Sequence, residues 1–169
     1  MKIGKFDLET DGIYIIAELS ANHNGKLQNA LDAIKAAKDI GADCIKLQTY
    51  TADTITLDCK KNDFMINHGT LWDGRYLYDL YKEASTPWDW PKKLFEYARS
   101  IDIDIFSSPF DKTAVDFLEQ FNPTAYKIAS FEITDYELIR YTAAKGRPMI
   151  ISTGIASFDE IQDAVNICR

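Results

Sequence analysis

The sequence predicts an α/β fold with a parallel sheet, and two observations lead to this prediction. Five short apolar runs typical of strands alternate with five segments of helical periodicity along most of the chain. No hairpin signal lies between successive runs, so we expect parallel strands joined by right-handed crossovers. An open doubly wound sheet and a (β/α) barrel both fit this pattern. The first strand is not followed by Gly-x-Gly-x-x-Gly, which disfavours a dinucleotide-binding version of the open sheet.

The strands and helices follow each other in a regular order. We expect strands over residues 13–19, 43–50, 104–108, 125–130 and 148–152, and helices over residues 29–40, 86–100, 113–121, 136–145 and 158–169. Ala30, Ile34 and Ala37 recur at helical spacing in the first helix, which Gly41 ends. Thr86 followed by Pro87 predicts the start of the second helix, because threonine is a good cap and proline suits the first helical position.

Size and composition are those of one globular domain. The chain has 169 residues, of which 46% are hydrophobic and 27% charged, with a net charge of −7. This acidic balance disfavours general nucleic-acid binding. We expect no transmembrane or secretory segment, and three cysteines without metal-type spacing predict a cytoplasmic protein with reduced thiols.

One long stretch, residues 51–86, lacks any regular pattern apart from a helical hint over residues 76–84. We call this stretch the excursion. Irregular segments of this length in compact domains are usually functional lids or cover a site. Its aromatic residues could line a sugar site, although the spacing of Tyr78 and Tyr81 is also that of ordinary helix packing.

Polar side chains lie where the predicted strands end, although strands of a parallel sheet are usually apolar throughout. In barrels the active site is built at these carboxyl ends. The candidate residues are Glu18, Lys46, Gln48, Ser108, Lys127, Ser130, Glu132 and Ser152.

The two lysines within strands carry the most information, because an ammonium group is rarely buried without a partner. Together with the hydroxyl groups, Lys46 and Lys127 predict a site for phosphate or carboxylate. The alternative is that the lysines only form ion pairs with Glu18 and Glu132. Those two glutamates could equally act as general acid and base or bind sugar hydroxyl groups.

The histidines and Cys44 are weaker candidates. His23 lies in an Asn-His-Asn-Gly turn and could be a metal ligand or proton carrier, but a single histidine in a turn more often makes a backbone contact. His68 has no informative neighbours. Cys44 is expected to be a small buried apolar residue.

Several segments jointly resemble the sialic acid (nonulosonic acid) synthase family. They are residues 16–25 (Ile-Ala-Glu-Leu-Ser-Ala-Asn-His-Asn-Gly), 41–50, 106–111 (Phe-Ser-Ser-Pro-Phe-Asp), 126–132 (Tyr-Lys-Ile-Ala-Ser-Phe-Glu) and 150–154. Residues 71–75 and 81–88 look more like the pseudaminic acid synthase branch than the N-acetylneuraminate synthase branch.

This resemblance implies a TIM-type barrel that condenses phosphoenolpyruvate with the open-chain aldehyde of an N-acylated hexosamine. The products would be a nine-carbon 2-keto acid and phosphate. By the same resemblance, Ser108, Lys127, Ser130 and Ser152 would hold the phosphate, and Lys46 the carboxylate or phosphate. Glu18, Gln48 and Glu132 would face the sugar and the reacting carbons, with Glu18 and Glu132 as the catalytic pair.

The resemblance covers only part of a synthase. It implies that residues 1–169 are the N-terminal part of the barrel, with about five of the eight β/α units. The remaining units and a C-terminal antifreeze-like domain would be absent. A divalent metal, Mn or Mg, is expected from the family, with its two histidine ligands outside this chain. The implied partners are the two small-molecule substrates and, in the full-length protein, a second subunit of a homodimer.

Two other functions remain open at this point. One is a barrel enzyme of the aldolase type, in which a lysine forms a Schiff base with the substrate. The other is a sugar- or phosphate-binding module without catalytic activity. We expect the 169-residue chain to be inactive by itself and, because its sheet would have two open edges, to self-associate.

Overall fold

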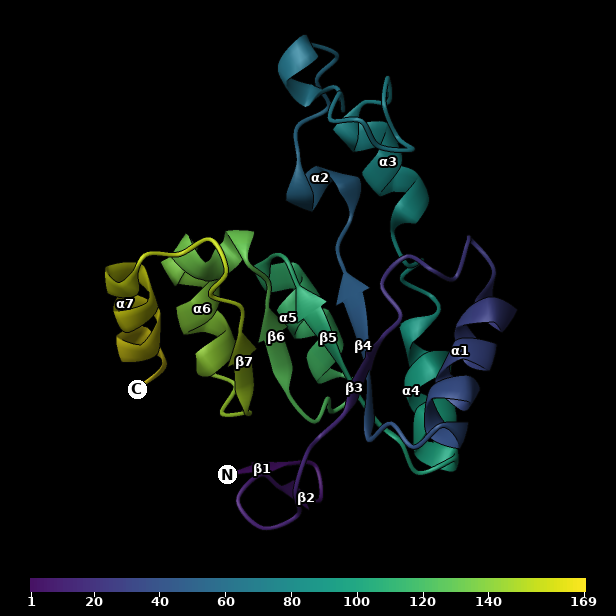
Figure 1. The fold of residues 1–169 in the computed structure, drawn as a ribbon, viewed down its shortest axis with the longest axis vertical. Coiled ribbons are helices and arrows are strands. Elements are labelled where there is room, and N and C mark those ends of the chain that lie inside the picture. The colour runs from purple at the N-terminus through teal and green to yellow at the C-terminus, as the bar shows by residue number, and fades with distance from the viewer.

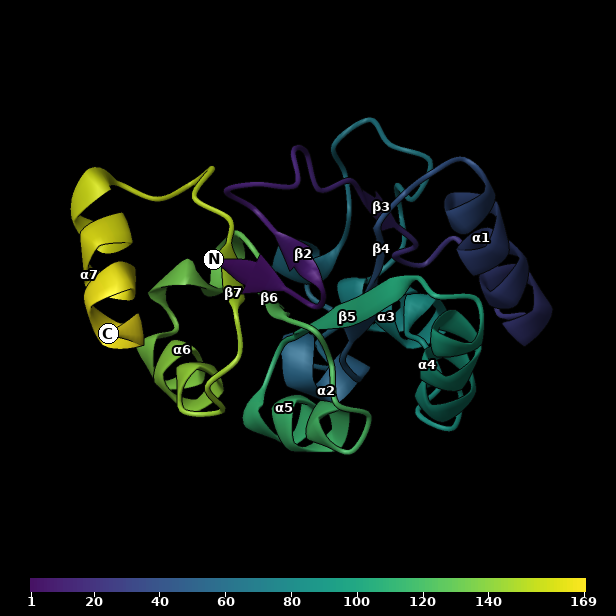
Figure 2. The same cartoon turned by 90° about the horizontal axis from the view of Figure 1, so that it is seen from below.

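The computed structural model describes residues 1–169 and contains a curved sheet of five parallel strands in the order β3-β4-β5-β6-β7. The strands are β3 (Ile16–Glu18), β4 (Cys44–Thr49), β5 (Asp104–Pro109), β6 (Tyr126–Ile128) and β7 (Met149–Ile151). The helices that connect them lie along one side of the sheet, and the other side is concave (Figures 1 and 2). A doubly wound sheet carries helices on both faces, so the arrangement is half of a TIM-type (β/α) barrel. The predicted fold is confirmed.

The outer face of the sheet packs against the helices. These are α1 (Leu27–Asp39), α4 (Pro91–Ser100), α5 (Lys112–Glu119), α6 (Tyr136–Ala143) and α7 (Phe158–Cys168). Twenty buried residues form one hydrophobic cluster, in which Ile45 and Leu47 of β4 lie together with residues of α1 and α4 such as Ile34 and Leu94. This cluster makes the strands a rigid base for the side chains on the inner face.

Local sequence signals explain where the helices begin. Asp111 caps α5 by accepting hydrogen bonds from the backbone N–H groups of Thr113 (2.9 Å) and Ala114 (3.3 Å). The predicted start at Thr86 and Pro87 is wrong: α4 begins at Pro91, with this second proline in the first turn. The Thr86 hydroxyl lies 3.3 Å from a histidine ring nitrogen instead of capping a helix.

A short antiparallel hairpin precedes the sheet and was not anticipated from the sequence. It consists of β1 (Lys2–Ile3) and β2 (Phe6–Asp7), too short for a recognisable alternation of apolar and polar residues. Figure 2 shows it at the amino-terminal end of the strands. Ile3 is buried there in a second apolar cluster with Cys44, Phe106 and Ala125. The hairpin therefore closes the lower end of the half-barrel interior.

The excursion rises beyond the carboxyl ends of the strands (Figure 1). It contains α2 (Ala52–Ile55), the 3-10 turn η1 (Asn62–Phe64) and α3 (Leu77–Ala84), separated by irregular chain. A second 3-10 turn, η2 (Phe131–Thr134), follows β6 at the same end of the sheet. None of the helices combines the length and the apolar character that crossing a membrane requires.

Candidate active site

The strand pairing brings the predicted polar residues onto one face of the sheet. Side chains two apart on a strand share a face, so Lys46 and Gln48 lie on the same side as Cys44, whose side chain belongs to the inner apolar cluster. Glu18 pairs in register with Lys46, and Gln48 with Ser108. The inner face therefore has an apolar layer near the hairpin and a polar layer at the carboxyl ends.

Lys46 forms an ion pair in this polar layer. Its Nζ lies 2.7 Å from Oε1 of Glu18. The Lys46 side chain is only 11% exposed, whereas that of Glu18 is 59% exposed. For Lys46, this contact agrees with the alternative interpretation of the sequence, in which the strand lysines form ion pairs with glutamates. The exposed Glu18 carboxylate nevertheless stays accessible to a molecule entering from the concave side.

Lys127 has no carboxylate in contact, unlike Lys46. Its ammonium donates to the carbonyl oxygen of Ile128 (2.9 Å) and to the hydroxyl of Ser152. Burial and then the neighbouring positive charge of Lys46 lower the pKa of Lys127, and the more distant carboxylates of Glu18 and Glu132 offset this only in part. Two ammonium groups held close together with hydroxyl donors are what an anion site requires. The predicted pairing of Lys127 with Glu132 is not formed.

Two buried oxygens of the site have no hydrogen-bond partner, Oγ of Ser108 and Oε2 of Glu132. Buried polar atoms are normally satisfied, so unpaired ones at strand ends indicate groups arranged for a ligand. Burial raises the pKa of Glu132 on η2, and the nearby Asp135 raises it further, which outweighs the lowering by a hydrogen bond to its own backbone and by Lys127. A glutamate in this environment holds its proton more readily than an exposed one and can serve as a general acid.

The remaining predicted hydroxyl, Ser130, lies at the start of η2 beside the end of β7. A Cβ atom built on Gly154 would lie 3.9 Å from Ser130 Oγ. The structure therefore brings Ser130 close to the segment that follows Ser152. By contrast, Ser107 pairs with Thr49 (Oγ to Oγ1, 2.7 Å), and its alternation with Ser108 turns it to the other face of β5.

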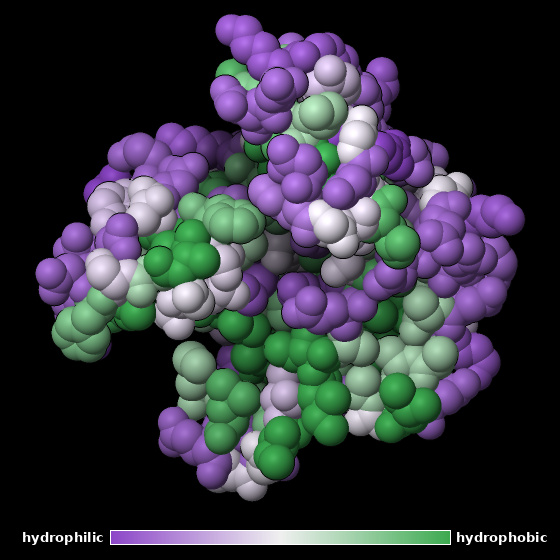
Figure 3. Space-filling view, turned by 45° about the horizontal axis from the view of Figure 1, so that its top comes forward, coloured by the Kyte–Doolittle hydropathy of each residue, from purple (hydrophilic) through white to green (hydrophobic).

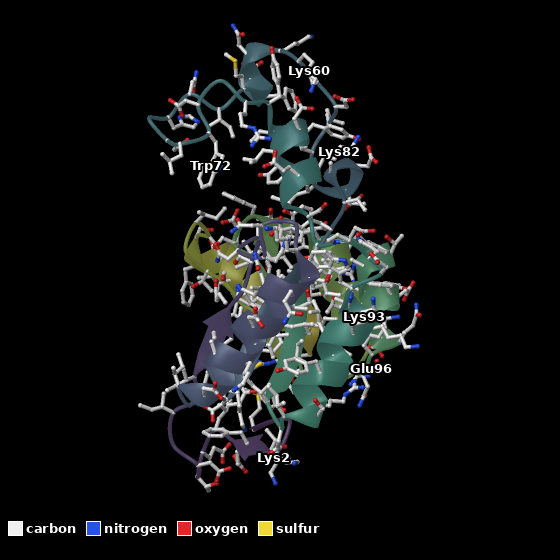
Figure 4. All side chains as sticks on the ribbon, turned by 90° about the vertical axis from the view of Figure 1, so that its right-hand side faces the viewer. Lys2, Lys60, Trp72, Lys82, Lys93 and Glu96 are labelled. Atoms are coloured by element: carbon white, nitrogen blue, oxygen red, sulfur yellow. The ribbon has the colours of Figure 1, made fainter.

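A cavity of about 430 Å³ lies between the loop that joins β3 to α1 and helix α3. We call it the excursion cavity. Asn22 and Asn24 line one wall, and Tyr50, Trp72 and Tyr81 contribute aromatic surface. In Figure 4 the Trp72 side chain points from the outer loop of the excursion towards the strand ends. The two asparagines were not recognised as candidates, because their turn gave no chemical signal beyond its shape.

The hydropathy of the surface differs between the two regions around this cavity. Figure 3 shows the excursion as mostly hydrophilic and the concave side below it as partly hydrophobic. Large apolar side chains exposed in the structure include Ile13, Ile15, Ile155 and Phe158. Such surface usually packs against further protein.

Comparisons with known proteins agree with this architecture. The model of the NeuB family matches residues 33–169. The chain belongs to the NeuB family. It is 53% identical over 161 residues to pseudaminic acid synthase of Campylobacter jejuni, which covers 95% of this chain and 46% of that protein. With pseudaminic acid synthase of Helicobacter pylori it shares 52% identity over 155 residues, covering 92% and 45%.

Among solved structures, the fold matches the N-acetylneuraminic acid synthetase of Leptospira borgpetersenii with a TM-score of 0.78. The two are 31% identical, and the match covers 92% of this chain and 50% of the other. The resemblance seen in the sequence is thus confirmed at the level of the family. The chain spans about half the length of the curated relatives it matches.

The residues of this NeuB-family chain do not form a metal site. No group of three or more His, Cys, Asp or Glu side chains is placed to hold a metal ion. His23 is buried, and its Nδ1 accepts a hydrogen bond from the backbone N–H of Gly25 (3.1 Å). His68 is exposed. Cys44 is buried in the apolar cluster, and burial raises the pKa of its thiol to about 12, as expected for an unreactive core cysteine.

Proposed function

We propose that this chain provides the anion-binding half of a phosphoenolpyruvate-dependent nonulosonate synthase. The observation that carries the proposal is Lys127, a partly buried ammonium without a carboxylate partner, beside Lys46 and the hydroxyl of Ser152. Membership of the NeuB family supports the same reaction class. The enzyme would join phosphoenolpyruvate to the open-chain aldehyde of an N-acylated amino hexose.

The site residues have distinct roles in this proposal. Lys127, Ser108, Ser130 and Ser152 bind the phosphate group, and Lys46 binds the carboxylate or the phosphate. Gln48 and Glu18 face the sugar from neighbouring strands. Glu132 lies on η2 at the same end of the sheet, where its raised pKa favours transfer of a proton to the developing alkoxide.

The atoms balance in two steps. The methylene carbon of phosphoenolpyruvate forms a bond to the aldehyde carbon, and the aldehyde oxygen takes a proton. Water then adds to the carbon that carries the phosphate oxygen, and phosphate leaves to give a 2-keto acid. The family resemblance implies a divalent metal, Mn or Mg. Its ligands would lie outside these residues, so none of the steps here is derived through it.

The acceptor sugar is proposed from the relatives. Identities of 52–53% to pseudaminic acid synthases favour a di-N-acylated amino hexose over N-acetylmannosamine. The product would then be pseudaminate rather than N-acetylneuraminate. By the family resemblance we also propose that the full-length protein is a homodimer.

One observation favours a second function. The lowered pKa of Lys127 would also suit a lysine that forms a Schiff base with a carbonyl substrate, as in aldolases. Such an enzyme would share the barrel and the phosphate site but not the chemistry. Trapping with borohydride separates the two, because only an imine is reduced to a stable adduct.

The test uses the full-length protein in which this chain occurs. With phosphoenolpyruvate, Mn²⁺ and either a mono- or a di-N-acetylated amino hexose, we expect phosphate release and a nine-carbon keto acid detected by mass spectrometry. No adduct should form with borohydride. Absence of phosphate release with every acceptor, or a borohydride-trapped lysine, would refute the synthase assignment.

The isolated chain 1–169 serves as a second sample. We expect it to release no phosphate above background and to self-associate in sedimentation experiments. The edges of β3 and β7 are open, and apolar side chains are exposed near them. A monomeric chain that turned over substrate would contradict the proposal that the site needs further protein.

A further inference from the structure

A buried histidine joins the two walls of the excursion cavity. His23 is 1% exposed and lies five residues after Glu18, in the loop between β3 and α1. Its Nδ1 accepts from the N–H of Gly25, and its Nε2 lies 3.3 Å from Oγ1 of Thr86. Because Nδ1 accepts, the neutral ring carries its proton on Nε2, which faces the Thr86 hydroxyl. The ring also hydrogen-bonds to the backbone of Ala84 at the end of α3.

The loop on the first wall has an unusual backbone. Ser20, Asn24 and Gly25 all have positive φ angles, of 49°, 50° and 66°. Asparagine and glycine adopt this conformation readily, but serine at Ser20 does so at a cost. Conformations of this kind persist where surrounding contacts enforce them. His23 supplies such contacts, because its ring bonds to Gly25 and its carbonyl oxygen accepts from the Asn29 side chain (3.0 Å).

The second wall is the end of the excursion. Thr86 is 6% exposed and follows α3, whose residues Tyr81 and Ala84 line the cavity. The His23 ring also contacts Trp90 edge-on, with a centroid separation of 5.2 Å. These contacts fix the histidine from the side of α4. His23 is therefore bonded to both walls and is itself absent from the cavity lining.

We propose that His23 is a positioning residue for the acceptor sugar. By holding the loop after Glu18 against the end of the excursion, it fixes the separation of Asn22 and Asn24 from Tyr81 and thereby the affinity for the acylated amino sugar. This inference rests on the proposed function and adds to it a residue that acts without touching the substrate. A histidine that only filled the core would affect stability and nothing else.

The sharpest variant is Thr86→Val, which removes the hydroxyl but keeps the shape of the side chain. The loss of one buried hydrogen bond corresponds to a change of up to about tenfold in an equilibrium constant. In the full-length protein we expect KM for the acceptor to rise about five- to tenfold. Both kcat and KM for phosphoenolpyruvate should stay within about twofold, since the anion site lies on the strands.

Two further variants separate the contacts of His23. Glutamine places an amide near the position of Nε2, whereas alanine leaves no polar group there. His23→Gln should therefore preserve acceptor KM better than His23→Ala, because it can still reach Thr86. Thr142→Val is the matched control: Thr142 is fully buried and donates to the carbonyl oxygen of Leu138 (2.8 Å) within α6, away from the cavity.

The control decides between positioning and mere stability. Thr142→Val should lower the melting temperature as much as Thr86→Val does and leave acceptor KM unchanged. An unchanged acceptor KM in Thr86→Val, or an equal rise in Thr142→Val, would overturn the role of His23. Loss of turnover in parallel with stability in all variants would overturn it as well.

Hydrogen exchange keeps the inference testable if the proposed reaction is wrong. In Thr86→Val we expect faster exchange at the Gly25 amide and in residues 77–84, and no change in β4 or β5. Failure of the wild-type protein to use phosphoenolpyruvate would refute the function alone. Unchanged exchange at Gly25 and in α3 would refute the linkage through His23, whatever the reaction.

Discussion

The strands and the excursion meet at the same site but are held in place very differently. The strands lie on a hydrophobic cluster of twenty buried residues. In the excursion, no residue between Ala52 and Thr86 is buried. A region without buried apolar contacts opens at a low free-energy cost. Under the proposed function, anion binding would lie on the rigid part and sugar selection on the part that can adapt.

The excursion is ordered by polar contacts at its surface. Tyr78 donates to Asp53 (2.9 Å), Lys60 pairs with Asp79 (2.6 Å) and Arg75 pairs with Glu83 (2.5 Å). Exposed ion pairs of this kind contribute little to stability, because water and salt screen them. They are enough to give the excursion a shape in the absence of ligand but not to make it rigid. Three predictions test this division.

The largest effect is expected at Lys127 on the rigid part. In the full-length protein, Lys127→Met should weaken the binding of phosphoenolpyruvate and of inorganic phosphate by at least about a hundredfold, measured by calorimetry. The melting temperature of the ligand-free protein should hold or rise, because the variant removes a partly buried charge without a carboxylate partner. Lys93→Met on α4, an exposed position (Figure 4), is the control and should change neither quantity.

The pH dependence follows from the lowered pKa of Lys127. As the pH rises through this pKa, the ammonium loses its charge and anion affinity falls, at a lower pH than the ordinary lysine value of 10.5 implies. Over the same interval, up to 10.5, the ligand-free native state gains stability relative to the unfolded chain, whose lysine is still charged. Both trends should vanish in Lys127→Met. Unchanged anion affinity in that variant would place the anion elsewhere.

A smaller but still large effect is expected at Glu132, which belongs to the same end of the sheet. Glu132→Gln should lower kcat by about a hundredfold, because glutamine cannot transfer a proton. Phosphoenolpyruvate binding should change much less. Glu137→Gln on α6 is the exposed control and should leave kcat unchanged. A loss confined to substrate binding would make Glu132 a charge partner rather than an acid.

The raised pKa of Glu132 also predicts the direction in which Glu132→Gln changes the stability of the fold. The raised pKa of Glu132 means that the native state retains a proton that the unfolded chain has released. Its stabilising contribution is complete below the ordinary value of 4.5 and is lost as the pH rises through the raised pKa. At neutral pH, Glu132→Gln should therefore be at least as stable as the wild type in thermal unfolding. Marked destabilisation there would contradict the absence of a partner for Oε2.

The sequence predicted the sheet and the polar residues of its inner face well, for a physical reason. Polar residues such as Lys46 and Lys127 are costly inside a parallel sheet, so they stand out in an apolar run. Their pairing was less predictable. In the structure, Lys46 forms an ion pair with Glu18, whereas Lys127 contacts no carboxylate. This difference depends on the register of the strands and on the path of η2.

Other features could not be predicted because their signals are weak or shared. Two-residue strands such as β1 are too short to show a periodicity. The hairpin, and the burial of its residue Ile3 in the inner apolar cluster, were therefore not predicted. Pro87 and Pro91 both suit a first helical turn, and the structure starts α4 at Pro91, with the Thr86 hydroxyl in contact with His23. The excursion cavity depends on contacts between segments far apart in the chain, which a pattern along one segment does not report.

The smallest effect is expected at Trp72 on the excursion. A tight turn presents this residue: Asp73 accepts from the N–H groups of Gly69 (3.0 Å) and Thr70 (2.9 Å), and Arg75 donates its N–H to the Trp72 carbonyl oxygen (3.0 Å). The side chain is 49% exposed, so core packing does not explain it. An aromatic face beside the amides of the excursion cavity suits the apolar part of an acylated sugar.

Trp72→Ala should therefore raise KM for the acceptor about three- to tenfold, corresponding to about 0.6–1.4 kcal/mol, with little change in kcat. Leu71→Ala, a neighbouring exposed residue outside the cavity lining, is the control. In the wild type, the acceptor sugar together with phosphoenolpyruvate should slow hydrogen exchange in residues 51–86, whereas inorganic phosphate alone should not. Two outcomes would contradict this: protection of the excursion by phosphate alone, or no protection with both substrates. Either would mean that sugar selection depends on the rigid strands and not on the excursion.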